Sequence, residues 1–428
     1  MPSPRYKVIH HTVPSSYIRE YLRATAFSQS LLSSQLSLSI NQYVPLSNPS
    51  PRPGDITLIA AHANGFPKEL YEPLWDDLIS LSNQPSSGFR IRSIWIADVA
   101  HQGASYVLNE SKLGNDPGWF DHSRDLLHLI NLKRDEMPAP IFGVGHSMGG
   151  AQLMNLALFH PRLFHGLVLL DPVIQSRSAE ILPGVDRRKQ LAAMSTFRRE
   201  RWGSREEAAA SFARSPFYKK WDKRCLARWV EFGLREGRSM LYPEAEEGSV
   251  GLTTPNGQEV YTFLRPNFEG KGGKVDWKRT PDVDPGNENN YPFYRREPNA
   301  MWDRIEELRP GVLFVIGGES NINGWGGVED REKRMGTGIG GSGGKSEGRV
   351  ESVTLEDVGH LVPIEEPTRT AEIMAKWLGK ATEMWHQDQE DLQKTWYAKI
   401  LKEKQQIGEE WKRHMGGEPV RAKKSSNI

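Results

Sequence analysis

The sequence predicts an α/β fold in which a mostly parallel sheet is flanked by helices. Two observations support this prediction. Short, almost continuously apolar segments alternate with segments of helical periodicity, and such apolar runs are typical of strands buried on both faces. A serine flanked by glycines lies between one of these strands and the following helix, which is an order of elements found in parallel sheets with crossover helices.

The expected elements follow one another along most of the chain. Two early strands precede a series that is almost continuously apolar from residue 55 onward, as buried parallel strands are. The expected strands are 7–13, 36–43, 55–61, 90–97, 141–144, 166–170, 311–316 and 352–355. Helical patterns separate them at 72–82, 120–132, 150–159 and 368–378. This alternation predicts a sheet built from βα units.

The alternation stops in the middle of the chain. Charged helical segments are expected at 187–201, 206–214 and 222–236, and sequence rich in Pro, Gly and Asn predicts extended loops from 248 to 298. We therefore expect four parts, namely a first core part (1–174), a cap or lid insertion (175–305), a second core part (306–380) and a helical C-terminal extension with a flexible tail (381–428). A cap of this kind would shape a substrate cavity.

The composition argues against several classes of protein. The 428 residues include 55 Lys and Arg against 54 Asp and Glu, so the net charge of +1 gives no field to attract nucleic acid. No apolar run approaches the roughly 20 residues of a membrane-spanning helix, and the N-terminus lacks the apolar stretch of a secretory signal. The single cysteine, Cys225, fits a reducing, intracellular compartment. We expect no cofactor and no metal, and the oligomeric state stays open.

The candidate nucleophile is Ser147. It lies in Gly145-His146-Ser147-Met148-Gly149, after the strand expected at 141–144 and before the helix expected at 150–159. Glycines two residues before and after the serine remove side chains that would collide in a tight turn, so the turn presents the hydroxyl at the end of the strand. His146 adjoins the nucleophile, and its side chain leaves the turn in another direction, which predicts a supporting role.

A serine hydroxyl is a poor nucleophile at neutral pH and needs a base that a third group orients. His360 is the candidate base, because it lies on a loop after the last strand, where open α/β sheets assemble their sites. Two acids compete for the orienting role, Asp171 and Glu319, each following a strand. In the commoner arrangement of this architecture, the acid stands three residues after the first glycine of the later turn. This chain has the uncharged Ser320 at that position, so we prefer Asp171.

Acyl chemistry also needs donors for an oxyanion. The backbone N–H of Met148 follows the serine at a helix N-terminus and is the first candidate. The second is expected from the loop after the strand at 55–61, and we choose the N–H of Phe66, with Asn64 as the alternative. The nearby turn that contains Gln102 is interpreted as scaffold.

The serine turn, the late histidine, the intermediate acid and the interrupted parallel sheet together resemble the α/β-hydrolase superfamily over about residues 55–378. Two segments, AHANGFPKELYEPLW at 61–75 and IWIADVAHQGAS at 94–105, are similar to a fungal subgroup that includes a hydrolase of AK-toxin-type toxin biosynthesis and a yeast peroxisomal lipase-like protein. The resemblance implies Ser147 and His360 as catalytic residues and a peroxisomal address, the alternative being the cytoplasm. The C-terminal Ser426-Asn427-Ile428 departs from the usual peroxisomal tripeptide.

These observations predict a serine hydrolase that cleaves a carboxylic ester or thioester of a small or lipid-like molecule through an acyl-enzyme, in the setting of fungal secondary metabolism that the resemblance implies. A serine at position 147 argues against epoxide and haloalkane hydrolases, which need an aspartate there. Two alternatives stay open. One is an acyltransferase or lyase on the same fold, and the other is a catalytically silent protein that binds a ligand or an assembly partner.

Overall fold

A computed structural model describes residues 5–27, 35–176, 188, 190–272, 274–278, 280–284, 290–323 and 327–416. The chain divides into two compact units, Met1–Thr382 and Glu383–Ile428. The C-terminal Ser426-Asn427-Ile428, which bears on the peroxisomal address that the resemblance implies, lies outside the described residues. Among the described helices, none is both long enough and apolar enough to cross a bilayer.

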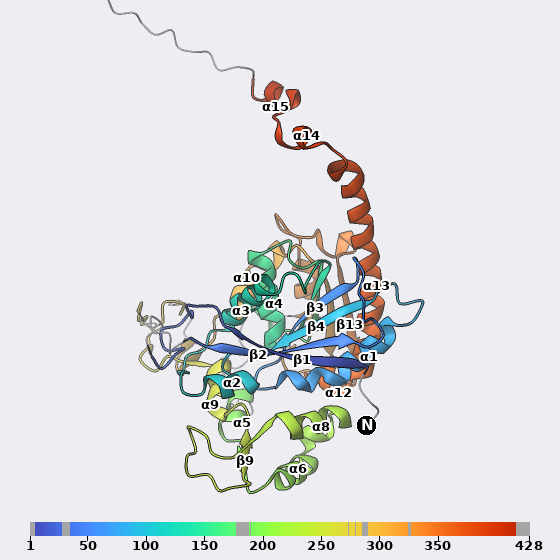
Figure 1. Ribbon diagram of the computed structural model, residues 1–428. Helices are drawn as coiled ribbons and strands as arrows, with labels where there is room; N and C mark the ends of the chain where they lie inside the picture. Colours follow the sequence, from blue (N-terminus) through green and yellow to red (C-terminus); the bar gives the residue numbers. More distant parts are fainter. Residues whose placement is uncertain are drawn as a thin grey trace, which may run out of the picture. The chain divides into compact units, whose positions relative to one another are not determined.

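A central sheet organises the first unit (Figure 1). Its strands are β1 (Tyr6–Pro14), β2 (Ser37–Pro45), β3 (Ile56–Ala61), β4 (Ile91–Ala97), β5 (Ile141–His146), β6 (Gly166–Leu170), β12 (Gly311–Gly317) and β13 (Val350–Leu355), in the order β1-β2-β4-β3-β5-β6-β12-β13. The β1–β2 and β2–β4 pairs are antiparallel and the other pairs are parallel. The mostly parallel sheet is therefore as predicted, and every expected strand is present with its ends shifted by two residues or fewer.

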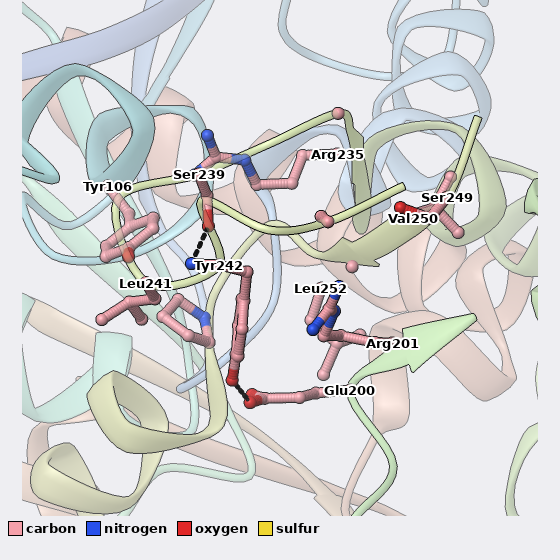
Figure 2. A pocket seen from close by; sticks show the side chains of 14 residues that line it. Tyr106, Glu200, Arg201, Arg235, Ser239, Leu241, Tyr242, Ser249, Val250 and Leu252 are labelled. Atoms are coloured by element: carbon pink, nitrogen blue, oxygen red, sulfur yellow. Dashed lines mark hydrogen bonds between the residues drawn. The ribbon is translucent and has the colours of Figure 1, made fainter. Parts of the chain in front are cut away.

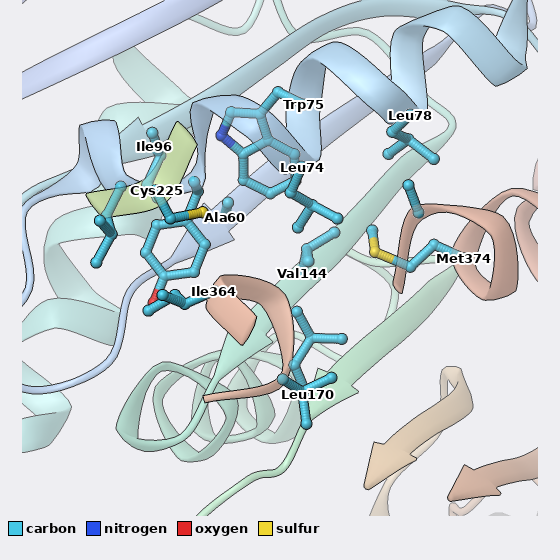
Figure 3. Close-up of a cluster of buried hydrophobic side chains, with 14 of the residues drawn as sticks. Ala60, Leu74, Trp75, Leu78, Ile96, Val144, Leu170, Cys225, Ile364 and Met374 are labelled. Carbon is cyan, nitrogen blue, oxygen red and sulfur yellow. The ribbon is translucent and has the colours of Figure 1, made fainter. Parts of the chain in front are cut away.

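Helices cover both faces of the sheet. The helices α1 (Glu72–Ser82), α12 (Val362–Glu365) and the first part of α13 (Pro367–Leu392) pack on one face, and α3 (Trp119–Leu132), α4 (Met148–Phe159) and α10 (Glu297–Asp303) pack on the other. Figure 3 shows the first of these cores, where Trp75 and Leu78 of α1 meet Val144, Leu170 and Met374. Between β4 and α3 the chain forms α2 (Gly103–Asn109), a helix that the sequence analysis did not predict.

The segment between β6 and β12 carries its own small elements, and α5, α6, α8, α9 and β9 gather together in Figure 1. They are α5 (Leu191–Thr196), β7 (Arg201–Trp202), α6 (Arg205–Arg214), α7 (Pro216–Lys219), α8 (Lys223–Phe232), β8 (Leu234–Glu236), β9 (Val250–Leu252), α9 (Asn256–Phe263), β10 (Arg265–Pro266) and β11 (Phe293–Tyr294). The expectation of extended loops from 248 to 298 is wrong for β9 and α9. Pro255 directly precedes α9, and a proline at the start of a helix costs no hydrogen bond, so it does not break the helix.

The remaining short elements of the first unit lie in connections. They are η2 (Lys68–Tyr71), η6 (Ile305–Glu307), α11 (Val328–Arg334) and η7 (Gly344–Glu347). In the second unit, α13 ends at Leu392 and is followed by a π-helix (Gln393–Tyr397), α14 (Leu401–Gln405) and α15 (Glu409–His414). The sequence predicts a helix at 368–378 and a separate helical extension from 381, but α13 runs through Gly379 without a break.

Candidate active site

Ser147 occupies a strained turn between β5 and α4. Its φ of 56° is in a region that residues with a side chain rarely adopt. A Cβ at Gly145 would lie 2.6 Å from the carbonyl oxygen of Gly149, and a Cβ at Gly149 would lie 2.2 Å from that of Ala61. The turn therefore needs both glycines. Ser147 is only 6 % exposed, less than the motif alone predicts, and His360 lies against its hydroxyl.

His360 joins the serine to an acid. It lies on the loop after β13, with its Nε2 at 2.8 Å from the Oγ of Ser147 and its Nδ1 at 2.6 Å from the Oδ2 of Asp171. An ionised carboxylate can only accept a hydrogen bond, so Nδ1 carries the proton and Nε2 is left to accept from the serine hydroxyl. This is the tautomer that a general base for Ser147 needs.

Asp171 follows β6 and is fully buried. Its carboxylate accepts hydrogen bonds from the hydroxyl of Ser320, from the Nδ2 of Asn323 at 3.0 Å and from the N–H of Gly317 at 3.3 Å. Burial would raise the pKa of Asp171, but the hydrogen bond and charge of His360, and then the bonds from Ser320 and Asn323, outweigh it and lower this pKa below its ordinary value. The group is therefore ionised at neutral pH. Sequence reasoning did not identify Ser320 or Asn323 as its partners.

Glu319, the alternative acid, points elsewhere. Its carboxylate pairs with the ammonium of Lys220 at 2.8 Å, and the glutamate side chain is 54 % exposed. Its backbone N–H donates to the carbonyl of Val358. The structure thus brings Ser147, His360 and Asp171 together, and it leaves Glu319 in a surface ion pair.

The loop after β3 carries the other predicted donors. The N–H of Phe66 donates to the carbonyl of Ala63 at 3.3 Å, a long bond within a turn. The side chain of Asn64 donates to the carbonyl of Glu259 at 3.0 Å and accepts from the Nε2 of Gln102 at 2.6 Å. Gln102 also accepts from the N–H of Gly65. Gln102, which lies in a turn interpreted from sequence as scaffold, therefore holds this loop.

The segment between β6 and β12 lies directly on the same loop. Gly65 has a φ of +84°, and a Cβ there would lie 2.6 Å from the carboxyl carbon of Glu259 in α9. The ring of Phe66 lies edge-on to Trp221 and Trp229, with centroid distances of 5.6 and 5.8 Å. The loop that precedes α1 is therefore bounded on this side by an acidic side chain and an aromatic surface.

A hollow between that segment and α2 is separate from Ser147, His360 and Asp171. Figure 2 shows it, with Tyr106, Arg201 and Arg235 among its lining and with the hydroxyl of Tyr242 directed at the carboxylate of Glu200. Within the described ranges, no group of three or more His, Cys, Asp or Glu side chains is spaced to hold a metal ion.

Comparisons with known proteins identify the family of the chain. The model of the Alpha/beta hydrolase family matches residues 58–373. The chain is 38 % identical to the type I acyl-CoA thioesterase mpaH of Penicillium roqueforti over 94 % of this chain and 96 % of the relative. It is 28 % identical to the abhydrolase domain-containing protein AKT2 of Alternaria alternata over 57 % of this chain and 85 % of the relative. Among solved structures, the peroxisomal alpha-beta-hydrolase Lpx1 of Saccharomyces cerevisiae has a similar fold, with a TM-score of 0.65, 18 % identity and 96 % of both chains covered.

Proposed function

The chain belongs to the alpha/beta hydrolase family, and from that membership we propose that it is a serine hydrolase that cleaves a thioester or carboxylic ester through an acyl-enzyme. The observation that supports this most is the unbroken series of hydrogen bonds from the Oγ of Ser147 through both ring nitrogens of His360 to Asp171. A base in contact with the hydroxyl and a buried acid that fixes its tautomer are what nucleophilic serine chemistry requires.

The chemistry follows from these contacts. The Oγ of Ser147 attacks the acyl carbon while the Nε2 of His360 takes the hydroxyl proton, and Asp171 stabilises the imidazolium that forms. The tetrahedral oxyanion accepts hydrogen bonds from the N–H of Met148 and from the N–H of Phe66, which gives up its long turn bond to Ala63, with Asn64 as the alternative. His360 then returns the proton to the leaving thiol or alcohol. Water, activated by the same imidazole, adds to the acyl-enzyme and releases the carboxylic acid.

A thioester of an apolar acyl group is the substrate class that we favour. Relatives that cover almost the whole chain are named type I acyl-CoA thioesterases. On the side of the oxyanion loop lies the partly buried ring of Phe66, which is backed by the buried rings of Trp221 and Trp229. Burying apolar acyl carbons against such rings contributes about 0.8 kcal/mol per methylene. Charged or strongly polar acyl groups would lose hydration there without compensation.

The same contacts support a division of the chain into a core and a cap. We propose that residues 175–305 act as a cap on a core made of 1–174 and 306–380, because α9 and the tryptophans of this segment contact the loop after β3. The helical extension 381–428, the peroxisomal address and a role in secondary metabolism stay predictions from sequence.

Covalent labelling tests the proposal. Purified protein is treated with a fluorophosphonate, which reacts with activated serines, and we expect labelling that is absent in Ser147→Ala. A panel of acyl-thioesters and matched oxygen esters of increasing acyl length then reports the substrate class, and we expect faster turnover of the thioesters with apolar acyl chains. A folded wild-type protein that is neither labelled nor active would favour the silent binding protein instead.

A further inference from the structure

His146 lies directly before the nucleophile, and both of its ring nitrogens are engaged. Its Nδ1 is 2.8 Å from the hydroxyl oxygen of Tyr71, and its Nε2 is 3.1 Å from the backbone carbonyl oxygen of His360. The same hydroxyl of Tyr71 lies 2.8 Å from the N–H of Ala63. Four groups, from two loops, the short helix η2 and the last residue of β5, are therefore joined in one series, and both Tyr71 and His146 are buried.

The direction of every hydrogen bond in this series follows from its ends. The N–H of Ala63 can only donate, so the oxygen of Tyr71 accepts from it. The carbonyl of His360 can only accept, so the Nε2 of His146 must carry a proton and donate to it. A neutral imidazole has one protonated nitrogen, so the Nδ1 of His146 is bare and accepts the hydroxyl proton of Tyr71. The series has a single arrangement, running from Ala63 to His360.

The protonation of His146 and Tyr71 is constant over a wide pH range. Burial, and then the charge of His360, lower the pKa of His146 to about 3, so this imidazole is neutral at the pH at which hydrolases of this family would act. Burial also raises the pKa of Tyr71 well above its ordinary value, so its hydroxyl keeps the proton that it donates. A neutral ring matters here, because the ring centroids of His146 and His360 are only 5.5 Å apart. A second charge at that distance would oppose the imidazolium that His360 becomes during attack.

We propose that Tyr71 and His146 are positioning residues that fix the backbone of His360 relative to the loop that supplies the second oxyanion donor. This inference rests on the proposed serine chemistry and extends it to two residues that do not touch the substrate. The base and the oxyanion donors act on opposite sides of the same acyl carbon, so their spacing has to be held while the bonds change. The series from Ala63 to His360 connects the two loops through hydrogen bonds that are shielded from water.

Three variants separate this role from a merely structural one. Gln in place of His146 has its Nε2 the same number of bonds from the backbone as the imidazole Nε2, so H146Q can still donate to the carbonyl of His360. H146M fills a similar volume and cannot donate. Y71F removes a single oxygen atom and is the variant least expected to disturb folding. The readouts are kcat, KM, the melting temperature and the downfield proton resonance of the Nδ1–H of His360.

We expect H146M to lower kcat by about 100-fold and Y71F by about 10-fold, each with KM changed by less than about twofold, because the lost contacts act on the geometry of the transition state. H146Q is expected to keep kcat within about fivefold of wild type, and the His360 resonance is expected to shift or broaden in H146M and to be retained in H146Q. Equal losses in H146Q and H146M, or losses of kcat that follow melting temperature alone, would overturn the proposal.

The failure of this inference can be told from the failure of the proposed function. Ser147→Ala removes turnover and leaves the series from Ala63 to His360 intact, so its His360 resonance is expected to be retained. A wild-type protein without turnover or labelling would sink the proposed function. In that case the resonance in Y71F and H146Q would still report whether the series holds the loop of His360. If H146M fails to fold, Y71F against wild type gives the same test.

Discussion

The Nε2 of His360 lies 2.8 Å from the Oγ of Ser147, although 213 residues separate the two in the chain. The sheet brings them together because parallel strands end at one edge, and the two residues follow β5 and β13 there. Asp171 follows β6 at the same edge and completes the contact with His360.

Asp171→Asn is expected to lower kcat by about 10³ to 10⁴-fold, because an amide at this position favours the wrong tautomer of His360. Glu319→Gln is the matched control, since it also neutralises one acid after a sheet strand. We expect it to change kcat/KM by less than about twofold, because it removes only a surface ion pair with Lys220. Steady-state kinetics of both variants decide between the acids, and a larger loss in the Glu319 variant would transfer the orienting role to it.

Ser320→Ala tests the support of the buried acid. The hydroxyl of Ser320 donates to the Oδ2 of Asp171, the oxygen that also binds His360. Its loss removes one of the interactions that lower the pKa of Asp171, and we expect kcat to fall by about 5- to 20-fold, as for a hydrogen bond to a charged group worth about 1.5 kcal/mol. Ser320→Thr keeps the hydroxyl and is the control, with kcat expected near wild type. Identical kinetics of the alanine variant and wild type would show that Asn323 and Gly317 suffice.

Gly65→Ala is expected to disturb the oxyanion loop. The added Cβ would meet the carboxyl carbon of Glu259 at 2.6 Å. Glu259 cannot move aside easily, because its carboxylate binds the hydroxyl of Ser195 and the guanidinium of Arg198. The residue also has a φ of +84°, which costs alanine about 1–2 kcal/mol. We expect kcat to fall by about 10-fold or more, since a loop displaced by a fraction of an ångström misplaces its donor.

Gly237→Ala provides the control for backbone strain without collision. Its φ is +77°, and nothing lies within 4 Å of the added Cβ. We expect it to lose only the roughly 1–2 kcal/mol that positive φ costs alanine, measured by urea unfolding, and to keep kcat unchanged. The double variant Gly65→Ala with Glu259→Ala should recover part of the lost kcat if the collision, rather than the strain, displaces the loop. No recovery would assign the effect to the backbone of Gly65 itself.

Much of the fold could be predicted from sequence because the central strands β3, β5, β6 and β12 are short apolar runs that need no distant partner to be identified. The three residues of the site could be predicted for a related reason, since Ser147, Asp171 and His360 each follow a predicted strand. The glycine pattern around Ser147 is also local, and the close contacts of Gly145 and Gly149 explain it.

The partners of these residues could not be predicted, because they come from loops whose course depends on tertiary contacts. Tyr71, Gln102 and Glu259 carry no local pattern that marks them as neighbours of the loop after β3. Gly379 shows the same limit for a helix. A glycine inside a helix costs about 1 kcal/mol relative to alanine, yet α13 continues through Gly379. The glycine is needed there because a Cβ would lie 2.3 Å from the carbonyl oxygen of Ser87, a contact that the sequence does not reveal.

His122 makes stability depend on pH. Its ring is fully buried in α3, and neither nitrogen has a hydrogen-bond partner among the described residues. Burial, partly opposed by the charge of Asp125, lowers the pKa of His122 to about 3. Between pH 3 and the ordinary value of 6.5 the unfolded chain therefore binds this proton and the folded chain does not, so stability falls as pH falls through that range. One such group contributes up to about 1.4 kcal/mol per pH unit to the slope of the free energy of unfolding against pH.

Two substitutions separate the charge of His122 from its unpaired polar atoms. Met has no titrating group and no unpaired donor, so His122→Met is expected to be at least as stable as wild type at pH 8. Below pH 6.5 its free energy of unfolding is expected to exceed that of wild type by an amount that increases as the pH falls. His122→Gln does not titrate but still buries unpaired polar atoms, so it should show the same flattened pH dependence without the gain at pH 8. Urea unfolding at pH 8, 6, 5 and 4 measures both effects. Parallel curves for wild type and the two variants would mean that the folded state protonates His122 as readily as the unfolded chain does.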